Sequence, residues 1–400
     1  MRLLVLTSRV SYPIEKGDKL RAFNFIRELS KYYDIFLFSI DEAKSSEESL
    51  NVLRQYCKDI RIFPISKGRI LMNLARTMFQ KIPFQVGYYT SKKSIDAFRQ
   101  YYDEVKPDHI FCQLLRVTEH VKDIDIPKTI DIQDTMSVNI ARSAKKVNIF
   151  RRPFYNVEVL RMKRYEHDIF SIYDNKIIIS DADRKLYPHP NKEQISIVPN
   201  GVDFSYFKPK DDIIKDIDVV FTGNMGYTPN IDASEFLIKK ILPIVKSEKP
   251  DVKIAIVGAN PSHKLMKLQC DNVVVTGWVN DMRDYYMRAK VFIAPMRIGT
   301  GLQNKLLEAM AMRLPCITTP LANNSLKAAD NTEILIGDDA GSLANNIIRL
   351  LNDNNLAQQI ADNGCQFVHK TYNWQNVGQT INHLIAETQH DASLHTKTQI

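Results

Sequence analysis

The chain has 400 residues, of which 44% are hydrophobic and 25% are charged, a composition typical of a globular protein that can bury a core. Its length exceeds what one compact core usually accommodates, so we predict two domains. No apolar run reaches the roughly 18 residues of a membrane span, and the opening MRLLVLTSRV resembles a buried strand more than a signal peptide, so we expect the protein to stay in the cytoplasm.

The chain contains 5 cysteines and 9 histidines, and both are scattered without the spacing of a zinc site, a redox dithiol or an HExxH motif. We therefore expect reduced packing cysteines and no metal. The net charge of +8 is uneven: residues 1–200 contain 34 Lys and Arg against 25 Asp and Glu, whereas the remainder contains 20 against 21. This asymmetry suggests that the first half meets an anionic surface or substrate.

In the first half, short apolar strands alternate with longer segments of helical periodicity, which predicts βαβ units and a parallel sheet. The predicted strands are Leu3–Thr7, Ile35–Ser39, Ile60–Phe63, His109–Cys112, Thr129–Ile132, Lys176–Ile179 and Ile195–Val198.

Two segments of the first half are strongly basic and also apolar. Lys67–Lys93 contains six basic residues and no acidic one, and Arg142–Arg164 contains eight basic residues against Glu158 alone. Both fit helices that lie on an anionic membrane surface. They fit equally well solvated helices that pack their apolar side inward. Nucleic acid is disfavoured because no recognition motif accompanies the charge.

The segment 198–212, with its Pro-Asn-Gly turn signal, predicts an interdomain linker. The second half then repeats the alternating pattern, which predicts a second doubly wound domain. Its predicted strands are Asp218–Thr222, Lys253–Val257, Val273–Thr276, Val291–Ala294, Pro315–Thr318 and Glu333–Ile336.

The stretch 294–320 combines a strand, two glycines and a helical pattern whose apolar face is Leu302, Leu306 and Met310. On another face Gly301, Asn304, Lys305 and Glu308 follow at helical spacing. A helix N-terminus behind glycines favours phosphate, and a carboxylate one turn further on suits a ribose diol. The alternative is a surface Lys–Glu pair of small energetic effect.

Five motifs, in this order along the chain, resemble the retaining family 4 glycosyltransferases with the GT-B fold. They are IVPNGVDFSYFKP, VVFTGNMGYTPNIDA, IAIVGANP, VTGWVNDMRDYY and GLQNKLLEAMAMRLPCITT. In the first half, KGDKLRAFNFIREL is similar to the sugar transferases of exopolysaccharide systems. The resemblance covers nearly the whole chain.

The resemblance implies an α/β chain with two Rossmann-like parallel-sheet domains that face each other across a cleft. The expected divisions are an acceptor-binding domain over 1–197, a nucleotide-sugar-binding domain over 198–372, a helix over 373–388 that crosses back to the first domain, and a frayed tail over 389–400. The implied activity is sugar transfer, with retention, from a nucleotide-diphosphate sugar to a hydroxyl of a lipid-linked or glycan acceptor. No cofactor or metal is expected. Peripheral membrane association is a further expectation, from the basic segments.

By the same resemblance, Glu308 matches the second glutamate of an E-x7-E signature and binds the donor ribose. Thr300 stands where the first glutamate contacts the donor sugar, so this chain departs from the pattern there. A second departure follows the first strand of the second domain, where Gly223 and Asn224 occur in place of an Arg and Lys pair that neutralises the diphosphate.

A diphosphate leaving group still needs a donor that stabilises its charge. The nearest cations are Lys305 and Arg297, with the backbone N–H groups of Gln303 and Asn304 as a supplement. We rank Lys305 first.

In the first domain, Gly17 follows the first strand where this fold brings backbone close to phosphate and acceptor, although an ordinary turn glycine is the alternative. Asp18, Lys19 and Arg21 are candidates for sugar or phosphate contacts, and Asp18 is equally a helix cap.

TIDIQDTMS places Asp131 and Asp134 at a strand end that faces the expected cleft. Many relatives hold a donor-sugar hydroxyl near there with a histidine. Asp134 is our candidate for that role, with helix capping as the alternative. Trp278, Val279 and Asn280 match the loop that reads the nucleobase, and a buried core tryptophan is the alternative for Trp278.

Two other functions compete with transfer. One is a GT-B sugar-nucleotide epimerase or hydrolase, which shares the donor site but uses acid and base carboxylates and no acceptor. The other is a non-catalytic GT-B protein that binds a nucleotide sugar or a partner enzyme, and the two departures from the family pattern motivate it.

Overall fold

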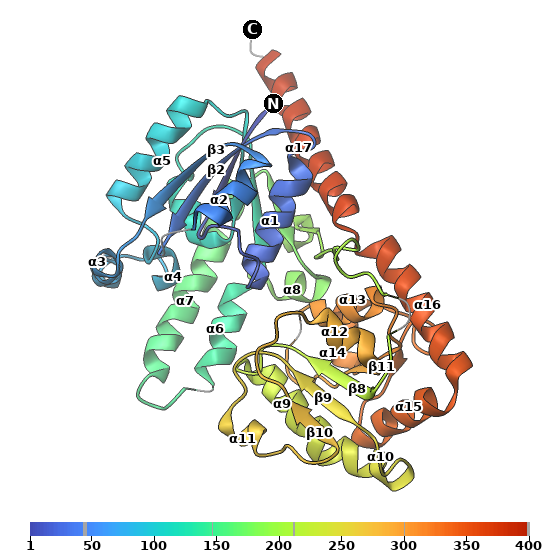
Figure 1. Cartoon of the computed structure of the whole chain (residues 1–400). Coiled ribbons are helices and arrows are strands. Elements are labelled where there is room, and N and C mark those ends of the chain that lie inside the picture. The colour runs from blue at the N-terminus through green and yellow to red at the C-terminus, as the bar shows by residue number, and fades with distance from the viewer. Residues whose placement is uncertain (43–45, 146, 211–212, 300, 398–400) are drawn as a thin grey trace. The chain divides into compact units, whose positions relative to one another are not determined.

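The computed structural model of the chain describes residues 1–42, 46–145, 147–210, 213–299 and 301–397, and side chains as far as residue 390 (Figure 1). The chain divides into two compact units. The first contains Met1–Pro199 together with Trp374–Ile400, and the second contains Asn200–Asn373. Each predicted strand overlaps a strand of the structure, because buried parallel strands appear in the sequence as short continuous apolar runs.

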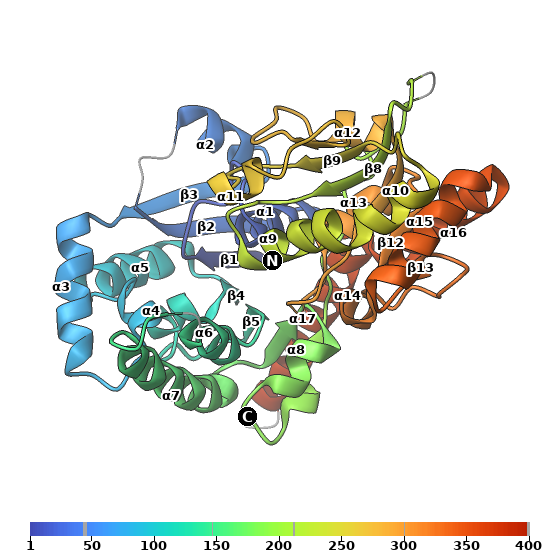
Figure 2. The same ribbon diagram turned by 90° about the horizontal axis from the view of Figure 1, so that it is seen from below.

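The first unit is built on a sheet of seven parallel strands in the order β3-β2-β1-β4-β5-β6-β7, of which β1 to β5 are labelled in Figure 2. Its strands are β1 (Arg2–Thr7), β2 (Asp34–Asp41), β3 (Cys57–Pro64), β4 (His109–Gln113), β5 (Lys128–Gln133), β6 (Asn175–Ile178) and β7 (Ser196–Ile197). Its helices are α1 (Gly17–Leu29), α2 (Glu47–Arg54), α3 (Lys67–Met78), α4 (Phe84–Gly87), α5 (Lys92–Val105), α6 (Met136–Ala144), α7 (Arg152–Asp168), α8 (Asp181–Leu186) and α17 (Trp374–Lys397), with short turns η1 (Leu115–His120), η2 (Ile169–Ile172) and η3 (Lys192–Gln194).

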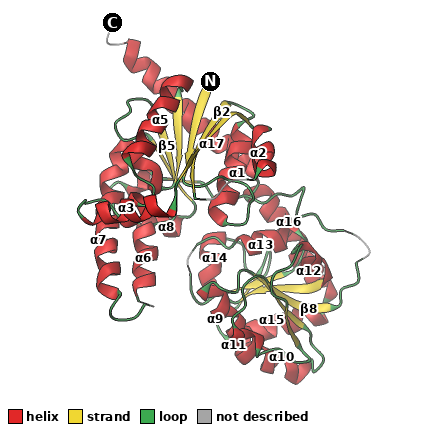
Figure 3. Ribbon diagram, turned by 60° about the vertical axis from the view of Figure 1, so that its left-hand side comes forward, coloured by secondary structure: helices red, strands yellow, loops and turns green. Residues whose placement is uncertain are grey.

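Both faces of this sheet are covered (Figure 3). Successive strand residues point to opposite faces, so Leu3 and Val5 of β1 pack with α1 and α17, whereas Leu4 and Leu6 pack with α5, η1, α6 and α7. On the first face Trp374 of α17 meets the ring of Phe25 edge to face, with 6.0 Å between the ring centres. The C-terminal helix is therefore part of the core of the first unit. It continues to Lys397, beyond residue 388, where we expected it to end, so the frayed tail that we predicted from residue 389 is wrong as far as Lys397.

The second unit is built on a sheet of six parallel strands in the order β10-β9-β8-β11-β12-β13. Its strands are β8 (Ile217–Thr222), β9 (Ile254–Val257), β10 (Val273–Val275), β11 (Ala289–Ala294), β12 (Cys316–Thr318) and β13 (Leu335–Ile336). Its helices are α9 (Thr228–Phe236), the π-helical turn η4 (Leu237–Ile241), α10 (Leu242–Glu248), α11 (His263–Met266), α12 (Arg283–Arg288), α13 (Asn304–Ala311), α14 (Pro320–Leu326), α15 (Ala340–Asn352) and α16 (Asn354–Thr371).

In both sheets the strand order runs outward in both directions from the first strand, which is the doubly wound arrangement predicted from the sequence. Such sheets bind ligands outside the carboxyl ends of their strands, at the point where the strand order reverses. In the first unit this point lies between β1 and β4, and in the second between β8 and β11. Among the residues that the structure describes, no helix combines the length and the apolarity needed to cross a membrane.

Candidate active site

Most of the predicted donor-binding residues lie in loops at the carboxyl edge of the second sheet. Gly223 and Asn224 follow β8, Trp278 and Val279 follow β10, and α13 carries Lys305 and Glu308. The switch point between β8 and β11 is thus flanked by the residues that the sequence singled out.

The turns after β8 and β9 approach each other so closely that both need glycine. Gly223 and Gly258 have φ angles of +150° and +143°, values that side chains disfavour. A Cβ atom on Gly258 would lie 1.8 Å from the carbonyl oxygen of Gly223. A Cβ atom on Gly223 would in turn lie 3.1 Å from the Lys305 ammonium. The glycines therefore hold two loops together and leave room beside Lys305.

The Lys305 ammonium is the cation at the centre of this edge. It donates a hydrogen bond of 2.5 Å to Asn230 Oδ1 and lies 4.6 Å from the centre of the Phe221 ring. Removal from water lowers the pKa of Lys305 to about 7, an effect that the carboxylate of Glu308 partly opposes. Near neutral pH a substantial fraction of Lys305 is therefore the neutral amine, which is poised to take up a proton when an anion arrives.

Asn230 connects Lys305 to the loop after β8. Its amide Nδ2 donates to the backbone carbonyl of Asn224 over 2.9 Å, while its Oδ1 accepts from Lys305. The side chain of Asn224 accepts from the N–H of Gly226 over 2.9 Å and so closes the same turn. One asparagine from α9 thereby fixes both the loop and the cation.

Glu308 lies one helical turn beyond Lys305 and is oriented by a buried tyrosine. The Tyr286 hydroxyl donates to Glu308 Oε2 over 2.9 Å and also meets Thr222 Oγ1 at 2.9 Å. Desolvation raises the pKa of Glu308, and the Tyr286 hydrogen bond and the Lys305 charge oppose that rise. The other carboxylate oxygen, Oε1, is suited to accept hydrogen bonds from hydroxyl groups such as those of a ribose.

The N-terminus of α13 begins at Asn304, so Gly301 and Leu302 precede the helix, and the predicted helical face is shorter than expected. Gln303 occupies the N-cap position, but its side chain donates to the Gly301 carbonyl over 2.9 Å instead of capping the helix. Asn304 accepts a hydrogen bond of 3.1 Å from Asn200 of the linker. Thr300 lies outside the described residues, and its role stays a prediction.

Arg297 and Trp278 are both exposed. Arg297 makes two hydrogen bonds to the Asp232 carboxylate, of 2.7 and 3.0 Å, and stacks on Phe236. The Arg297 charge is therefore already paired with a carboxylate. Trp278 is 72% exposed, so the alternative of a buried core tryptophan is wrong, whereas Val279 packs partly against the core.

In the first unit, Gly17 is the first residue of α1, and a Cβ atom there would meet nothing within 4 Å. Packing within the unit therefore does not require glycine at this position. Asp18 is not the helix cap, because Lys16 occupies that position. The Asp18 carboxylate instead pairs with Arg9 at 2.7 Å. Lys19 is half-buried.

The interpretation of Arg21 as a contact to sugar or phosphate is wrong, because its buried side chain is paired with Asp131. Both side chains are fully buried, and the Arg21 guanidinium grips Asp131 with Nε–Oδ2 and Nη2–Oδ1 distances of 2.9 Å. Arg21 Nη2 also donates to the Val198 carbonyl over 2.8 Å. The pair joins α1 to β5, and Arg21 also joins α1 to Val198, close to where the first segment of the unit ends at Pro199. Its role is therefore structural. The sequence did not reveal it because the two residues are 110 positions apart.

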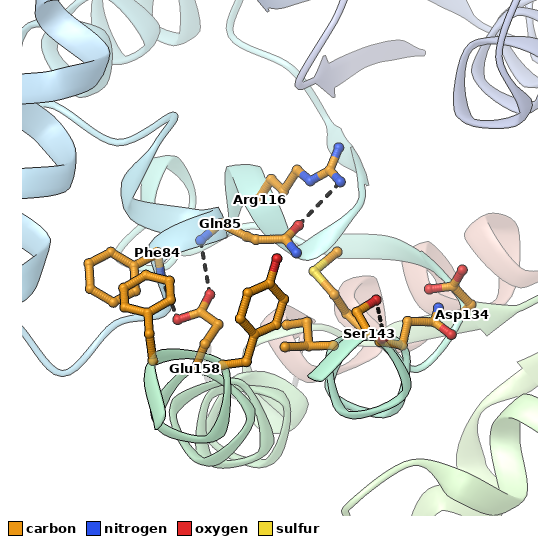
Figure 4. Close-up of a pocket in the computed structure, with 11 residues that line it drawn as sticks. Phe84, Gln85, Arg116, Asp134, Ser143 and Glu158 are labelled. Carbon is orange, nitrogen blue, oxygen red and sulfur yellow. Dashed lines mark hydrogen bonds between the residues drawn. The ribbon is translucent and has the colours of Figure 1, made fainter. Parts of the chain in front are cut away.

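Asp134 lies in the loop between β5 and α6 and lines a pocket of the first unit (Figure 4). Thr135 is the N-cap of α6, and the N–H of Ser137 is taken by Glu166 at 3.1 Å, so capping by Asp134 is not what the structure shows. Desolvation and the nearby Asp183 raise the pKa of Asp134 to about 6, against the opposing charge of Arg116.

Sequence reasoning missed three residues that the structure places at these edges, namely Asn230, Tyr286 and Arg116. Asn230 and Tyr286 stand inside motifs that carry the family resemblance, YTPNIDA and MRDYY, and that position was the available signal. Arg116 had no such signal. Within the described residues no group of His, Cys, Asp and Glu is arranged to hold a metal ion.

Comparison with known proteins agrees with this geometry. Residues 216–353 match the family model described as Glycosyl transferases group 1. An uncharacterized 44.6 kDa protein in the cps region of Klebsiella pneumoniae is 23% identical over 95% of this chain and 98% of its own length. The UDP-Gal:alpha-D-GlcNAc-diphosphoundecaprenol alpha-1,3-galactosyltransferase of Escherichia coli is 29% identical over 42% of this chain and 48% of its own length.

Among solved structures, sucrose-phosphate synthase from Thermosynechococcus elongatus superposes with a TM-score of 0.70 at 16% identity, over 97% of this chain and 99% of that one. The fold is GT-B, as predicted, and the match to the group 1 glycosyltransferase model lies within the second unit. The resemblance to glycosyltransferases of exopolysaccharide systems is confirmed, and it supports glycosyl transfer as the activity.

Proposed function

We propose that this protein is a retaining glycosyltransferase that moves a sugar from a nucleoside-diphosphate sugar to a hydroxyl of a lipid-linked or glycan acceptor. The observation that carries the proposal is the pairing of Lys305 and Glu308 on adjacent turns of α13, with glycine turns beside them at the carboxyl edge of the second sheet. The similarity to a galactosyltransferase whose name includes UDP-Gal and a diphosphoundecaprenol acceptor supports the donor and acceptor classes.

The two side chains divide the work of holding the donor. The Lys305 ammonium neutralises the diphosphate, whose negative charge grows as the bond to the sugar breaks. The Glu308 carboxylate, held by Tyr286, accepts hydrogen bonds from the ribose. Lys305 thus stands in for the Arg and Lys pair that the resemblance leads one to expect after β8.

In the transfer step, the bond between the sugar C1 and the phosphate oxygen breaks, and its electron pair goes to that oxygen. The acceptor hydroxyl oxygen forms the new bond to C1 from the same face, and its proton passes to the departing phosphate. The leaving group therefore acts as the base, and retention requires no protein nucleophile. We also propose that no metal takes part and that the enzyme works as a peripheral protein on the inner face of a membrane.

The test is transfer by purified wild type, Glu308→Ala and Lys305→Ala with a panel of nucleotide sugars and membrane-lipid extract, with and without EDTA. Wild type should transfer sugar with retention and ignore EDTA. Each variant should lose about 10²-fold in kcat/KM, the scale of one lost transition-state contact, without a loss of thermal stability. Glu235→Ala and Lys239→Ala, which change an acidic and a basic residue that form an ion pair on α9 and η4 of the second unit, are the matched controls.

Turnover of Glu308→Ala at the wild-type rate would overturn the site assignment. Donor breakdown that needs no acceptor would favour the hydrolase or epimerase, and nucleotide-sugar binding without any turnover would favour the non-catalytic protein.

A further inference from the structure

The second unit contains a cavity of about 570 Å³ at the C-terminal end of α13. Its walls come from the segment 204–209, which precedes β8, from the end of α13 and the turn after it, and from α16. Its size falls within the range of pockets that hold small ligands, roughly 300–1,000 Å³. Of the described residues that line it, none is proposed to hold the donor, so its ligand has yet to be assigned.

One wall of the cavity is aromatic. The rings of Phe204 and His369 stack with 3.6 Å between their centres and an interplanar angle of 18°, and Phe207 lines the same cavity. Burial, and after it the charge of Arg313, lowers the pKa of His369 below its ordinary value of 6.5. The imidazole is therefore mostly neutral at pH 7 and adds an uncharged ring. Such a wall suits a ligand that contains an aromatic ring of its own.

Two cations, Arg313 and Lys208, line the cavity together with one carboxylate, that of Asp362. Asp362 Oδ1 lies 3.4 Å from Arg313 Nε, yet it accepts no hydrogen bond from any residue that the structure describes. The Arg313 side chain is 58% exposed, and an exposed pair of this kind holds a guanidinium only weakly. The described lining thus has an excess of one positive charge, and a carboxylate or phosphate of a ligand would match it.

Arg313 also occupies a backbone position that favours glycine. Its φ angle is +53°, in the left-handed region, two residues after the end of α13. The weak pair with Asp362 does not offset the cost of that conformation, so stability does not explain an arginine here. Lys106 and Lys327 adopt the same conformation at other helix ends, so the conformation by itself assigns no site. Arg313 differs from them because its side chain lines a cavity.

We propose that this cavity binds a small organic anion, in which a carboxylate or phosphate group is attached to an aromatic ring. The anionic group accepts hydrogen bonds from Arg313 and Lys208, and the ring packs against Phe204 and Phe207. This second site lies at the last turn of α13, whereas Lys305 lies in the first turn. It goes beyond the proposed glycosyl transfer and does not depend on it.

The test is saturation-transfer NMR on the full chain with four probes. Phenyl phosphate and phenylacetate combine a ring with an anion, benzyl alcohol has the ring alone, and methylphosphonate has the anion alone. At least one of the two aromatic anions should give ring-proton signals, with a Kd at least about tenfold lower than those of the other two probes. Lys305→Gln should retain these signals, which shows that the probe does not bind at the proposed donor site.

Arg313→Gly should abolish the signals without lowering the melting temperature, because glycine suits the left-handed backbone there. Lys327→Gly makes the same kind of change at a left-handed helix end that does not line the cavity, so it is the matched control and should retain the signals. Lys208→Gln, which introduces no glycine, should weaken the binding of the aromatic anions as well.

Four results would each overturn the inference. They are no signal from either aromatic anion, equal affinity for benzyl alcohol, loss of the signals in Lys305→Gln, and signals that persist in both Arg313→Gly and Lys208→Gln. A melting temperature of Arg313→Gly well below that of Lys327→Gly would also overturn it, because Arg313 would then be explained by its structural role.

Discussion

At the scale of single residues, Lys305 is the most consequential side chain of the second unit. Its ammonium is held by Asn230 against the Phe221 ring, largely out of water. Burial disfavours the charged form of Lys305, and its pKa therefore falls to about 7 from an ordinary value of 10.5. Ligand binding and pH are therefore linked through this one group.

We predict that the affinity for a nucleoside diphosphate falls as pH rises above about 7. The empty site loses the Lys305 proton near pH 7, while a bound diphosphate keeps it, so binding above that pH takes up a proton. Between the pKa values of the empty and occupied site, the Kd should rise about tenfold per pH unit. Isothermal titration from pH 6.5 to 9 measures it, and Lys305→Gln should give weaker and much flatter binding. A flat wild-type profile would contradict the linkage.

The same pKa has an opposite effect on the empty protein. Because the folded pKa lies below the unfolded one, the unfolded chain binds more protons between about pH 7 and 10.5. Through Lys305, the free energy of unfolding of the empty protein should therefore increase as pH rises through that window.

At the scale of elements, the buried pair of Arg21 and Asp131 joins α1 to β5, and Arg21 also joins α1 to the carbonyl of Val198 at the end of the first unit. α1 begins at Gly17, so this pair also sets where the loop before α1 lies. Because both side chains are buried, the pair is not available to ligands.

We predict that Arg21→Met lowers the free energy of unfolding of the first unit by about 3–5 kcal/mol, because it leaves the Asp131 charge buried without its partner. Adding Asp131→Leu should restore part of the loss. The chain has 2 tryptophans, and Trp374 packs in the first unit on Phe25. Urea unfolding followed by fluorescence in a Trp278→Phe background therefore reports on that unit. A single variant as stable as the background protein would contradict the structural role.

At the scale of the molecule, the two basic segments of the first unit, 67–93 and 142–164, also expose large apolar side chains. The α3–α7 surface consists of exposed Leu71, Met72, Met78, Phe79, Ile149, Phe150, Phe154 and Leu160. Arg161 joins its two parts by donating to the carbonyls of Thr77 and Met78 at the end of α3. Phe79 and Phe150 are 92% and 90% exposed, which favours the membrane interpretation over helices that pack their apolar side inward.

We predict that the protein sediments with vesicles of phosphatidylcholine and phosphatidylglycerol at low salt, and poorly with phosphatidylcholine alone. Replacing Phe79 and Phe150 by serine should weaken binding by roughly tenfold or more, since each ring would no longer be buried in lipid. Ile214→Ser with Val274→Ser, two exposed apolar residues of the second unit, is the matched control. Equal binding to both vesicles would refute the anionic-surface role.

Much of the fold was predictable because its signals are local. Each strand of a covered parallel sheet is a short apolar run, and each run could be identified without knowing its neighbours. The pairing of Lys305 with Glu308 was also local, since helical spacing alone puts them on one face. Asp134 was singled out from the sequence, and its role stays a prediction, because the sequence could not show which side chains share its pocket.

The sequence by itself therefore determined the two doubly wound units and the helix that carries Lys305 and Glu308, because both follow from the periodicity of neighbouring residues. Only the tertiary structure decided that Asn230 holds Lys305, that Tyr286 orients Glu308 and that Arg21 belongs to the core. It also assembled the pocket of Arg116 and Asp134. Each of these depends on residues brought together from distant positions, and burial, which sets their charge and their partners, is a property of the packed chain.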